Sequence, residues 1–227
     1  MNILYLHGFG SSGQSNTVEY LKKVLPNDNI TAPDIQVDPA EALPFLKQLC
    51  EEERFDIIIG TSMGGMYAQQ LRNCTYRICV NPALHLSGIT DVLKVGTFPF
   101  FQPRKDGSTE FTITEEIIQH FREMEDHQFD EWKPDDPANL RCCGLFGTED
   151  TTVNCREEFA RYYSNVQTFE GGHRMNQKVL KNVVLPIIQL LEEKGRKAKI
   201  HVIESDEAMH KELMRIMREI AENEITD

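Results

Sequence analysis

The stretch DIIIGTSMGGMYAQQL, from Asp56 to Leu71, decides the fold. It begins with an apolar run typical of a buried strand, passes through a Gly-x-Ser-x-Gly turn and ends in a segment with helical periodicity. Gly60 and Gly64 flank Ser62 where the chain must turn sharply enough to leave the serine in a strained conformation. The stretch therefore predicts a strand, a tight turn that exposes the Ser62 hydroxyl, and a helix whose N-terminus faces it.

Short apolar runs and helix-period segments alternate on both sides of this stretch. The apolar runs are Asn2 to Leu6, Phe55 to Ile59, Tyr76 to Val80, Leu140 to Phe146 and Val166 to Phe169. The helix-period segments include Thr17 to Leu25, Leu43 to Glu52, Gly65 to Arg72, Arg156 to Tyr163 and Lys178 to Glu193. This alternation predicts an α/β fold, with a mostly parallel central sheet and helices on both of its faces.

Two stretches break the alternation and define the expected domain organisation. Residues 84–137 contain the aromatic run FPFF, a polar turn and a helix-like run, so we expect a lid-like insertion over one end of the sheet. Residues 196–227 resemble an extra strand and an amphipathic helix. This extension is either an arm that forms a homodimer or a plain cover for a sheet edge. Residues 1–195 are expected to form the main domain.

Composition narrows the class of partner. The chain has 227 residues with 24 Lys and Arg against 36 Asp and Glu, a formal net charge of -12. Nucleic acids and anionic membrane surfaces both need clustered basic side chains, so neither is an expected partner. The sequence lacks a secretory pattern and a long apolar run, and its six cysteines lack framework spacing. We expect a cytoplasmic protein with buried free thiols and a small-molecule partner.

Two further residues follow apolar runs in the chain order serine, acid, histidine. A serine hydroxyl needs a base, and the base needs an acid that orients it. Asp150 follows the run CCGLFG, and His173 follows two glycines after the run VQTF. Both are expected at the carboxyl edge of the sheet, near Ser62. Asp150 alternatively caps the next turn, and the adjacent Glu149 competes for the role of acid. The remaining histidines are less well placed: His85, His120, His127, His201 and His210.

Five motifs together resemble a known superfamily. The segments LYLHGFGSS, GTSMGGMYA, CVNPAL, GTED and FEGGHRM are similar to the α/β-hydrolases, specifically to the small bacterial esterases of the YqiA and YcfP type. The resemblance covers about residues 1–193. It implies hydrolysis of acyl esters or thioesters, with Ser62 as nucleophile, His173 as base, Asp150 as acid and no metal or cofactor. The acid motif departs from the family because Thr148 and Glu149 precede Asp150.

The opening segment YLHGFGSS is expected to form the other side of this site. The backbone N–H groups of Phe9 and Met63 would hold the oxyanion that develops on the substrate carbonyl. Gly8 and Gly10 would let the loop approach Ser62. His7 is expected to shape this loop by hydrogen bonding rather than to act as a base.

The sequence allows two roles for three aromatic residues, and it allows two alternative functions for the protein. Phe98, Phe100 and Phe101 either line an apolar wall for the acyl chain or belong to the core. A binding module on a hydrolase scaffold is the first alternative function, although an intact set of candidate catalytic side chains argues against it. The second is a different hydrolase that uses the same side chains, such as a carbon–carbon bond hydrolase or a peptidase.

Overall fold

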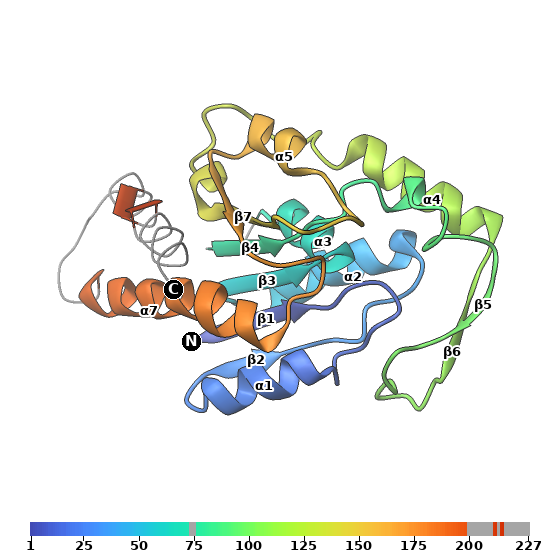
Figure 1. The fold of residues 1–227 in the computed structure, drawn as a ribbon, viewed down its shortest axis with the longest axis horizontal. Helices are drawn as coiled ribbons and strands as arrows, with labels where there is room; N and C mark the ends of the chain where they lie inside the picture. Colours follow the sequence, from blue (N-terminus) through green and yellow to red (C-terminus); the bar gives the residue numbers. More distant parts are fainter. Residues whose placement is uncertain (73–75, 199–210, 213, 216–227) are drawn as a thin grey trace.

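The computed structural model describes residues 1–72, 76–198, 211, 212, 214 and 215. Its main sheet has six strands in the spatial order β2-β1-β3-β4-β7-β8, and every pairing in it is parallel (Figure 1). The strands are β1 (Asn2–Leu6), β2 (Asn29–Thr31), β3 (Ile57–Thr61), β4 (Tyr76–Val80), β7 (Cys142–Gly147) and β8 (Asn165–Phe169). The α/β class and the parallel sheet expected from the sequence are therefore confirmed.

Helices cover both faces of the sheet (Figure 1). One face carries α1 (Asn16–Val24) and a C-terminal helical segment built of α6 (Gln177–Val179), the π-helical turn η3 (Leu180–Val184) and α7 (Leu185–Ala198). The other face carries α2 (Pro39–Glu52), α3 (Met63–Gln70), α4 (Glu115–His127) and α5 (Arg156–Tyr162). The sheet is thus the middle layer of three.

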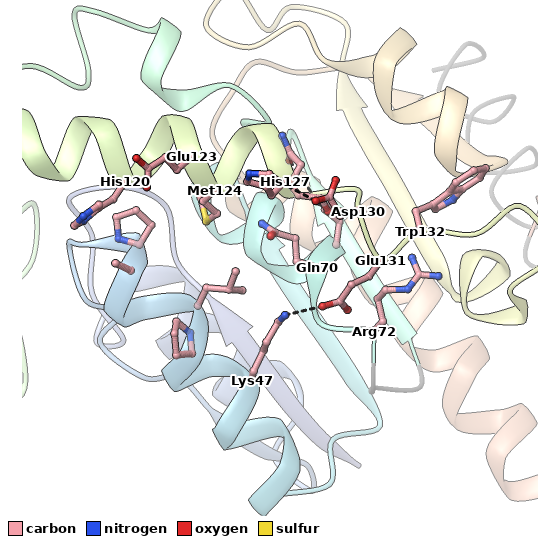
Figure 2. Close-up of a pocket in the computed structure, with 16 residues that line it drawn as sticks. Lys47, Gln70, Arg72, His120, Glu123, Met124, His127, Asp130, Glu131 and Trp132 are labelled. Carbon is pink, nitrogen blue, oxygen red and sulfur yellow. Dashed lines mark hydrogen bonds and ion pairs between the residues drawn. The ribbon is translucent and has the colours of Figure 1, made fainter.

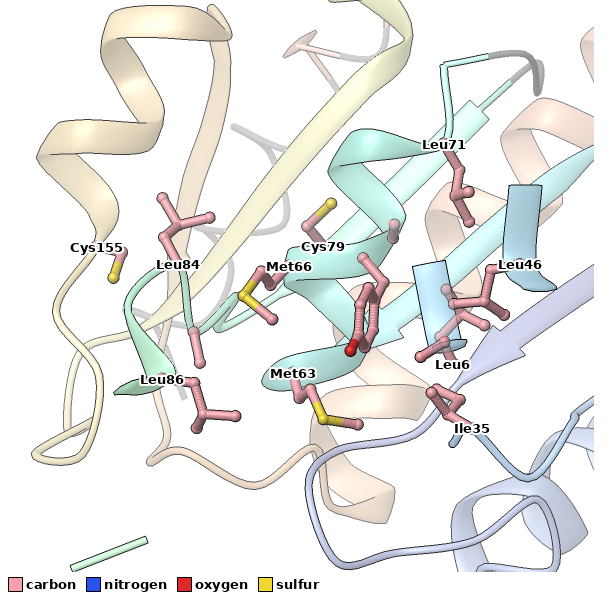
Figure 3. Close-up of a cluster of buried hydrophobic side chains, with 14 of the residues drawn as sticks. Leu6, Ile35, Leu46, Met63, Met66, Leu71, Cys79, Leu84, Leu86 and Cys155 are labelled. Atoms are coloured by element: carbon pink, nitrogen blue, oxygen red, sulfur yellow. The ribbon is translucent and has the colours of Figure 1, made fainter. Parts of the chain in front are cut away.

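Alternate residues of each strand feed the two hydrophobic cores. In β1, Ile3 and Tyr5 pack with the α1 and α7 face, whereas Leu4 and Leu6 pack with the α2 and α3 face. Figure 3 shows the second core around Met66, where side chains of α2, α3 and the loop after β4 meet. Because both faces are buried, the strands appear in the sequence as continuous apolar runs.

The insertion holds a two-stranded hairpin as well as the expected helix. Strands β5 (Gly96–Pro99) and β6 (Glu110–Ile113) are antiparallel and stand beyond one end of the main sheet (Figure 1). Two short helical turns, η1 (Leu86–Gly88) and η2 (Pro137–Arg141), lie near its ends. Helix α4 buries Ile118 and Phe121 in the same core as α3, so it packs as part of the domain.

The predicted extension lies mostly outside the described residues. Helix α7 continues to Ala198, three residues beyond the expected boundary at residue 195. The strand and helix predicted after it, and the homodimer predicted through residues 196–227, stay predictions. No helix in the described ranges is long and apolar enough to cross a membrane. Cys79, Cys142 and Cys155 are buried free thiols, Cys143 is buried as well, and Cys50 is partly exposed.

Candidate active site

Ser62 lies at the sharp turn between β3 and α3. Its backbone has φ 54° and ψ -119°, a conformation that non-glycine residues rarely adopt. A Cβ on Gly60 would lie 2.1 Å from the Gly64 carbonyl oxygen, and a Cβ on Gly64 would lie 2.1 Å from the Leu6 carbonyl oxygen. Only glycine fits at either position. The two glycines of the Gly-x-Ser-x-Gly pattern therefore allow α3 to start directly against the ends of β1 and β3.

Three candidate residues form one chain of hydrogen bonds. The His173 Nε2 atom lies 2.9 Å from Ser62 Oγ, and its Nδ1 atom lies 2.7 Å from Asp150 Oδ2. A carboxylate only accepts, so Nδ1 carries the proton and Nε2 is free to accept from the serine hydroxyl. The side chains come from loops after β3, β7 and β8, which meet at the carboxyl edge of the parallel sheet.

Asp150, and not its neighbour Glu149, contacts His173. The Asp150 side chain is 3% exposed, and its second oxygen, Oδ1, accepts hydrogen bonds from the N–H groups of Thr152 at 2.8 Å and Val153 at 3.0 Å. The Glu149 side chain is exposed, and its backbone N–H donates to the Gly171 carbonyl oxygen. Asp150 therefore both caps the turn and orients the imidazole.

Asn81 is a site residue that the sequence reasoning missed. It follows β4, is 1% exposed and has φ 44°, a left-handed conformation that asparagine tolerates. Its Oδ1 accepts from the Gly147 N–H at 2.7 Å, and its Nδ2 donates to the carbonyl oxygens of Gly172 at 3.1 Å and His173 at 3.0 Å. Asn81 thus ties the His173 loop to the end of β7. Its position directly after the apolar run in CVNPAL places it at the carboxyl edge of the sheet, but does not show which loops it joins.

The loop after β1 borders the Ser62 hydroxyl. A Cβ on Gly8 would contact the Ser62 Cβ at 3.4 Å and Oγ at 4.0 Å, so the backbone of this loop lies against the serine. Met63 is the first residue of α3, and its N–H is one of those that a helix leaves unpaired. In the described part of the chain, neither the Met63 N–H nor the Phe9 N–H donates to a protein acceptor.

His7 holds that loop through both of its ring nitrogens. The Ile35 N–H donates to His7 Nε2 at 3.0 Å, so Nδ1 carries the proton and donates to the Gly8 carbonyl oxygen at 2.8 Å. Burial lowers the pKa of His7 to about 4, which leaves the ring neutral near pH 7. Both ring nitrogens are therefore used to shape the loop. The loop then turns at Gly10, which has φ 69°.

The three aromatic residues of the insertion have different surroundings. Phe98 and Phe100 are partly buried and pack against Phe111, with ring centroids 6.0 and 4.7 Å apart. Phe101 is 71% exposed, and its N–H donates to the Gly10 carbonyl oxygen at 2.8 Å. Arg174, directly after His173, places its guanidinium carbon 6.0 Å from the Phe101 ring centroid. Phe98 and Phe100 thus join the core, while Phe101 lies at the surface beside the site.

A pocket of about 440 Å³ lies between α2, α4 and the end of α3 (Figure 2). Polar contacts border it: Lys47 pairs with Glu131 at 3.0 Å, and His127 Nδ1 lies 2.7 Å from Asp130 Oδ2. Ser62 begins α3, whereas the pocket contacts Gln70 at the other end of that helix, ~12 Å along its axis at 1.5 Å per residue. This pocket is separate from the hydrogen-bonded serine. No group of three or more His, Cys, Asp or Glu in the described ranges is placed to hold a metal ion.

Several solved structures share the fold of this chain. The monoacylglycerol lipase of Paleococcus ferrophilus is 14% identical with a TM-score of 0.57. The alignment covers 84% of this chain and 93% of the lipase chain. Alpha/beta hydrolase domain-containing protein 10 from mouse is 16% identical with a TM-score of 0.57. The alignment covers 85% of this chain and 90% of the mouse chain. Est1E from Butyrivibrio proteoclasticus is 13% identical with a TM-score of 0.54, covering 88% of each chain. The fold is therefore that of the α/β-hydrolases.

A comparison of the sequence with models of protein families identifies the family of this chain. The match to a family extends over most of the main domain, far beyond the short motifs around Ser62, Asp150 and His173. It confirms the resemblance to the YqiA and YcfP type that the five sequence motifs indicated. Residues 2–192 match the uncharacterised protein family UPF0227, and the chain belongs to that family.

Proposed function

We propose that the protein is a serine hydrolase that cleaves small acyl esters or thioesters through an acyl-enzyme on Ser62. The observation that carries this proposal is the chain of hydrogen bonds from Ser62 through His173 to Asp150, at 2.9 and 2.7 Å. Nucleophile, base and orienting acid within hydrogen-bond reach are the signature of an activated serine. The α/β-hydrolase fold, shared with proteins named as a monoacylglycerol lipase and a methylesterase, supports the same reaction class.

The first half-reaction forms the acyl-enzyme. Ser62 Oγ attacks the carbonyl carbon of the substrate while His173 Nε2 takes the hydroxyl proton. Asp150 keeps the other ring nitrogen protonated and stabilises the imidazolium that results. The tetrahedral intermediate then collapses, the bond to the leaving oxygen or sulfur breaks, and His173 gives that atom the proton.

The second half-reaction releases the acid. His173 takes a proton from water, the hydroxide attacks the acyl carbonyl, and Ser62 recovers its proton as it leaves. The N–H groups of Phe9 and Met63 would hold the oxyanion in both halves, because the loop after β1 and the start of α3 both border Ser62. Losing one such donor typically costs ~3 kcal/mol in the barrier.

A fluorophosphonate probe tests the proposal directly, since it phosphonylates only an activated serine. Mass mapping after incubation is expected to find the label on Ser62, and none on a folded Ser62→Ala variant. Hydrolysis of 4-nitrophenyl butyrate and of an acyl thioester should disappear in the same variant. Ser108, half-buried in the connection between β5 and β6, gives the matched control: Ser108→Ala should keep both labelling and turnover.

The outcomes also separate the alternative functions. A folded protein that is neither labelled nor active would contradict the hydrolase and favour a binding module. Labelling of Ser62 without turnover of esters or thioesters would favour another hydrolase, such as a carbon–carbon bond hydrolase or a peptidase. Neither the labelling of Ser62 nor the turnover depends on which role residues 196–227 have.

A further inference from the structure

Three chain segments meet near the proposed nucleophile, Ser62, through contacts among Gly10, Phe101 and Arg174. The Phe101 N–H donates to the Gly10 carbonyl oxygen at 2.8 Å, and the Phe101 ring edge lies 3.2 Å from where a Gly10 Cβ would be. The Arg174 guanidinium carbon lies 6.0 Å from the centroid of the same ring. The Phe101 ring therefore bridges the loop after β1 and the loop that carries His173.

The charge of Arg174 is not neutralised by the protein. The side chain is exposed, and within the described residues it forms no ion pair, although the chain has 36 acidic residues and 24 basic ones. A cation–π contact with an aromatic ring helps to orient a guanidinium and leaves its N–H groups available to a ligand. Such a group is suited to bind a planar or tetrahedral anion through paired hydrogen bonds.

The proposed reaction tells which part of the substrate lies next to the His173 loop. His173 must deliver its proton to the leaving oxygen or sulfur, so the leaving group lies on the His173 side of the scissile bond. The carbonyl oxygen lies on the opposite side, toward the N–H groups of Phe9 and Met63. Arg174 belongs to the same loop as His173, and its guanidinium extends from that loop toward the Phe101 ring.

We propose that Arg174 is a specificity-determining residue that binds an anionic group, a carboxylate or a phosphate, on the leaving group of the substrate. The exposed face of Phe101 holds the guanidinium in place and covers apolar atoms of that leaving group. The inference rests on the proposed serine hydrolase and narrows its substrates to acyl esters or thioesters of anionic alcohols or thiols.

A pair of esters that differ only in leaving-group charge tests the proposal. The charged ester is 4-carboxyphenyl butyrate, and its neutral counterpart is 4-carbamoylphenyl butyrate. We expect the ratio of their kcat/KM values to favour the charged ester and to fall about fivefold in Arg174→Met, the size of an exposed ion pair. The change should appear mainly in KM, and Arg174→Lys should restore part of it.

A second exposed arginine gives a matched control. Arg161 lies in the last turn of α5, at the end of that helix away from the Asp150 loop. Arg161→Met changes the net charge by the same amount, so it should leave the ratio as in the unmodified protein. An equal fall of the ratio in both variants would overturn the proposal, because long-range charge would then explain it.

A second pair of esters checks the side of the scissile bond. Mono-4-nitrophenyl glutarate carries its charge on the acyl group, and 4-nitrophenyl butyrate carries none. Arg174→Met should leave this ratio unchanged, and a fall here alone would overturn the leaving-group assignment. If the neutral esters are hydrolysed but no ratio depends on Arg174, the inference fails while the hydrolase stands. If no ester is hydrolysed and Ser62 stays unlabelled, the hydrolase itself fails.

Discussion

Asn81 and His173 are joined by a hydrogen bond from the buried Asn81 carboxamide to the His173 carbonyl oxygen, at 3.0 Å. The same Nδ2 donates to the Gly172 carbonyl oxygen at 3.1 Å, and the Asn81 Oδ1 accepts from the Gly147 N–H at 2.7 Å. The imidazole is therefore held from two directions, by Asp150 through its ring and by Asn81 through its backbone.

Removing the Asn81 carboxamide should lower turnover more than substrate affinity. In Asn81→Ala the His173 loop loses two hydrogen bonds from a buried donor, and a shift of the imidazole by about 1 Å can cost 100-fold. We expect kcat for 4-nitrophenyl butyrate to fall by about 10- to 100-fold while KM changes little. Steady-state kinetics of the folded variant measures both values.

Asn139 provides the control for this prediction. It is also a buried asparagine, but its amide donates to the Lys133 carbonyl oxygen in the segment that leads into β7. Asn139→Ala should reduce stability and leave kcat close to its original value. Wild-type kcat in a folded Asn81→Ala variant would show that the Asn81 bonds do not position His173.

Asp150→Asn should nearly abolish turnover, whereas Glu149→Gln should not. The Asp150 carboxylate holds the His173 Nδ1–H, and an amide in its place favours the wrong tautomer. The expected loss in kcat is about 10³- to 10⁴-fold. Glu149 is exposed and does not contact His173. Kinetics on both variants decides between the two carboxylates: damage from Glu149→Gln alone would reassign the acid.

Sequence patterns predicted most of the sheet because its strands are buried on both faces. The β1 and β4 runs were predicted with the observed bounds, Asn2–Leu6 and Tyr76–Val80, and the predicted bounds of β3, β7 and β8 differ by one or two residues. Strand β2 was not predicted, because its three residues, Asn29–Thr31, are too few to show a period. The β5–β6 hairpin was also missed, since half of its residues are exposed.

The site was predictable only where a residue sits in a local motif. Ser62 and His173 each follow a strand with glycines nearby, so position alone pointed to them. The choice between Glu149 and Asp150 depends on which carboxylate is buried, and two adjacent residues in a loop look alike in sequence. Asn81 acts across 66 and 92 positions, on Gly147 and His173, and no local pattern carries that information.

Gly64→Ala should destabilise the fold strongly, while Gly88→Ala should be tolerated. A Cβ on Gly64 would overlap the Leu6 carbonyl oxygen at 2.1 Å, and neither the sheet nor α3 can move without breaking the core. A Cβ on Gly88 meets no atom within 4 Å. We expect a loss of about 3 kcal/mol or more for the first variant and under about 1 kcal/mol for the second. Urea unfolding of both variants measures this difference, and equal stabilities would contradict the close approach of β1 and α3.

His7 should make the protein less stable as the pH falls below about 6.5. Burial lowers its pKa from 6.5 to about 4 in the folded state, so between these values the unfolded chain binds more protons. The stabilising contribution is complete above pH 6.5 and is lost as the pH falls toward 4. At 1.36 kcal/mol per pKa unit, the loss between about pH 7 and about pH 4.5 is about 2 to 3 kcal/mol.

His7→Gln tests this pH dependence, because glutamine can accept the Ile35 N–H bond but does not titrate. The variant should be less stable than the unmodified protein at neutral pH, since its fit in the loop is imperfect. As the pH is lowered, the difference in the free energy of unfolding should shrink by about 2 to 3 kcal/mol. His127→Gln, on an exposed side chain, should change the free energy of unfolding by less than about 1 kcal/mol. A constant difference for His7→Gln would mean that the folded protein accommodates a charged His7, which would contradict the neutral ring inferred from its two hydrogen bonds.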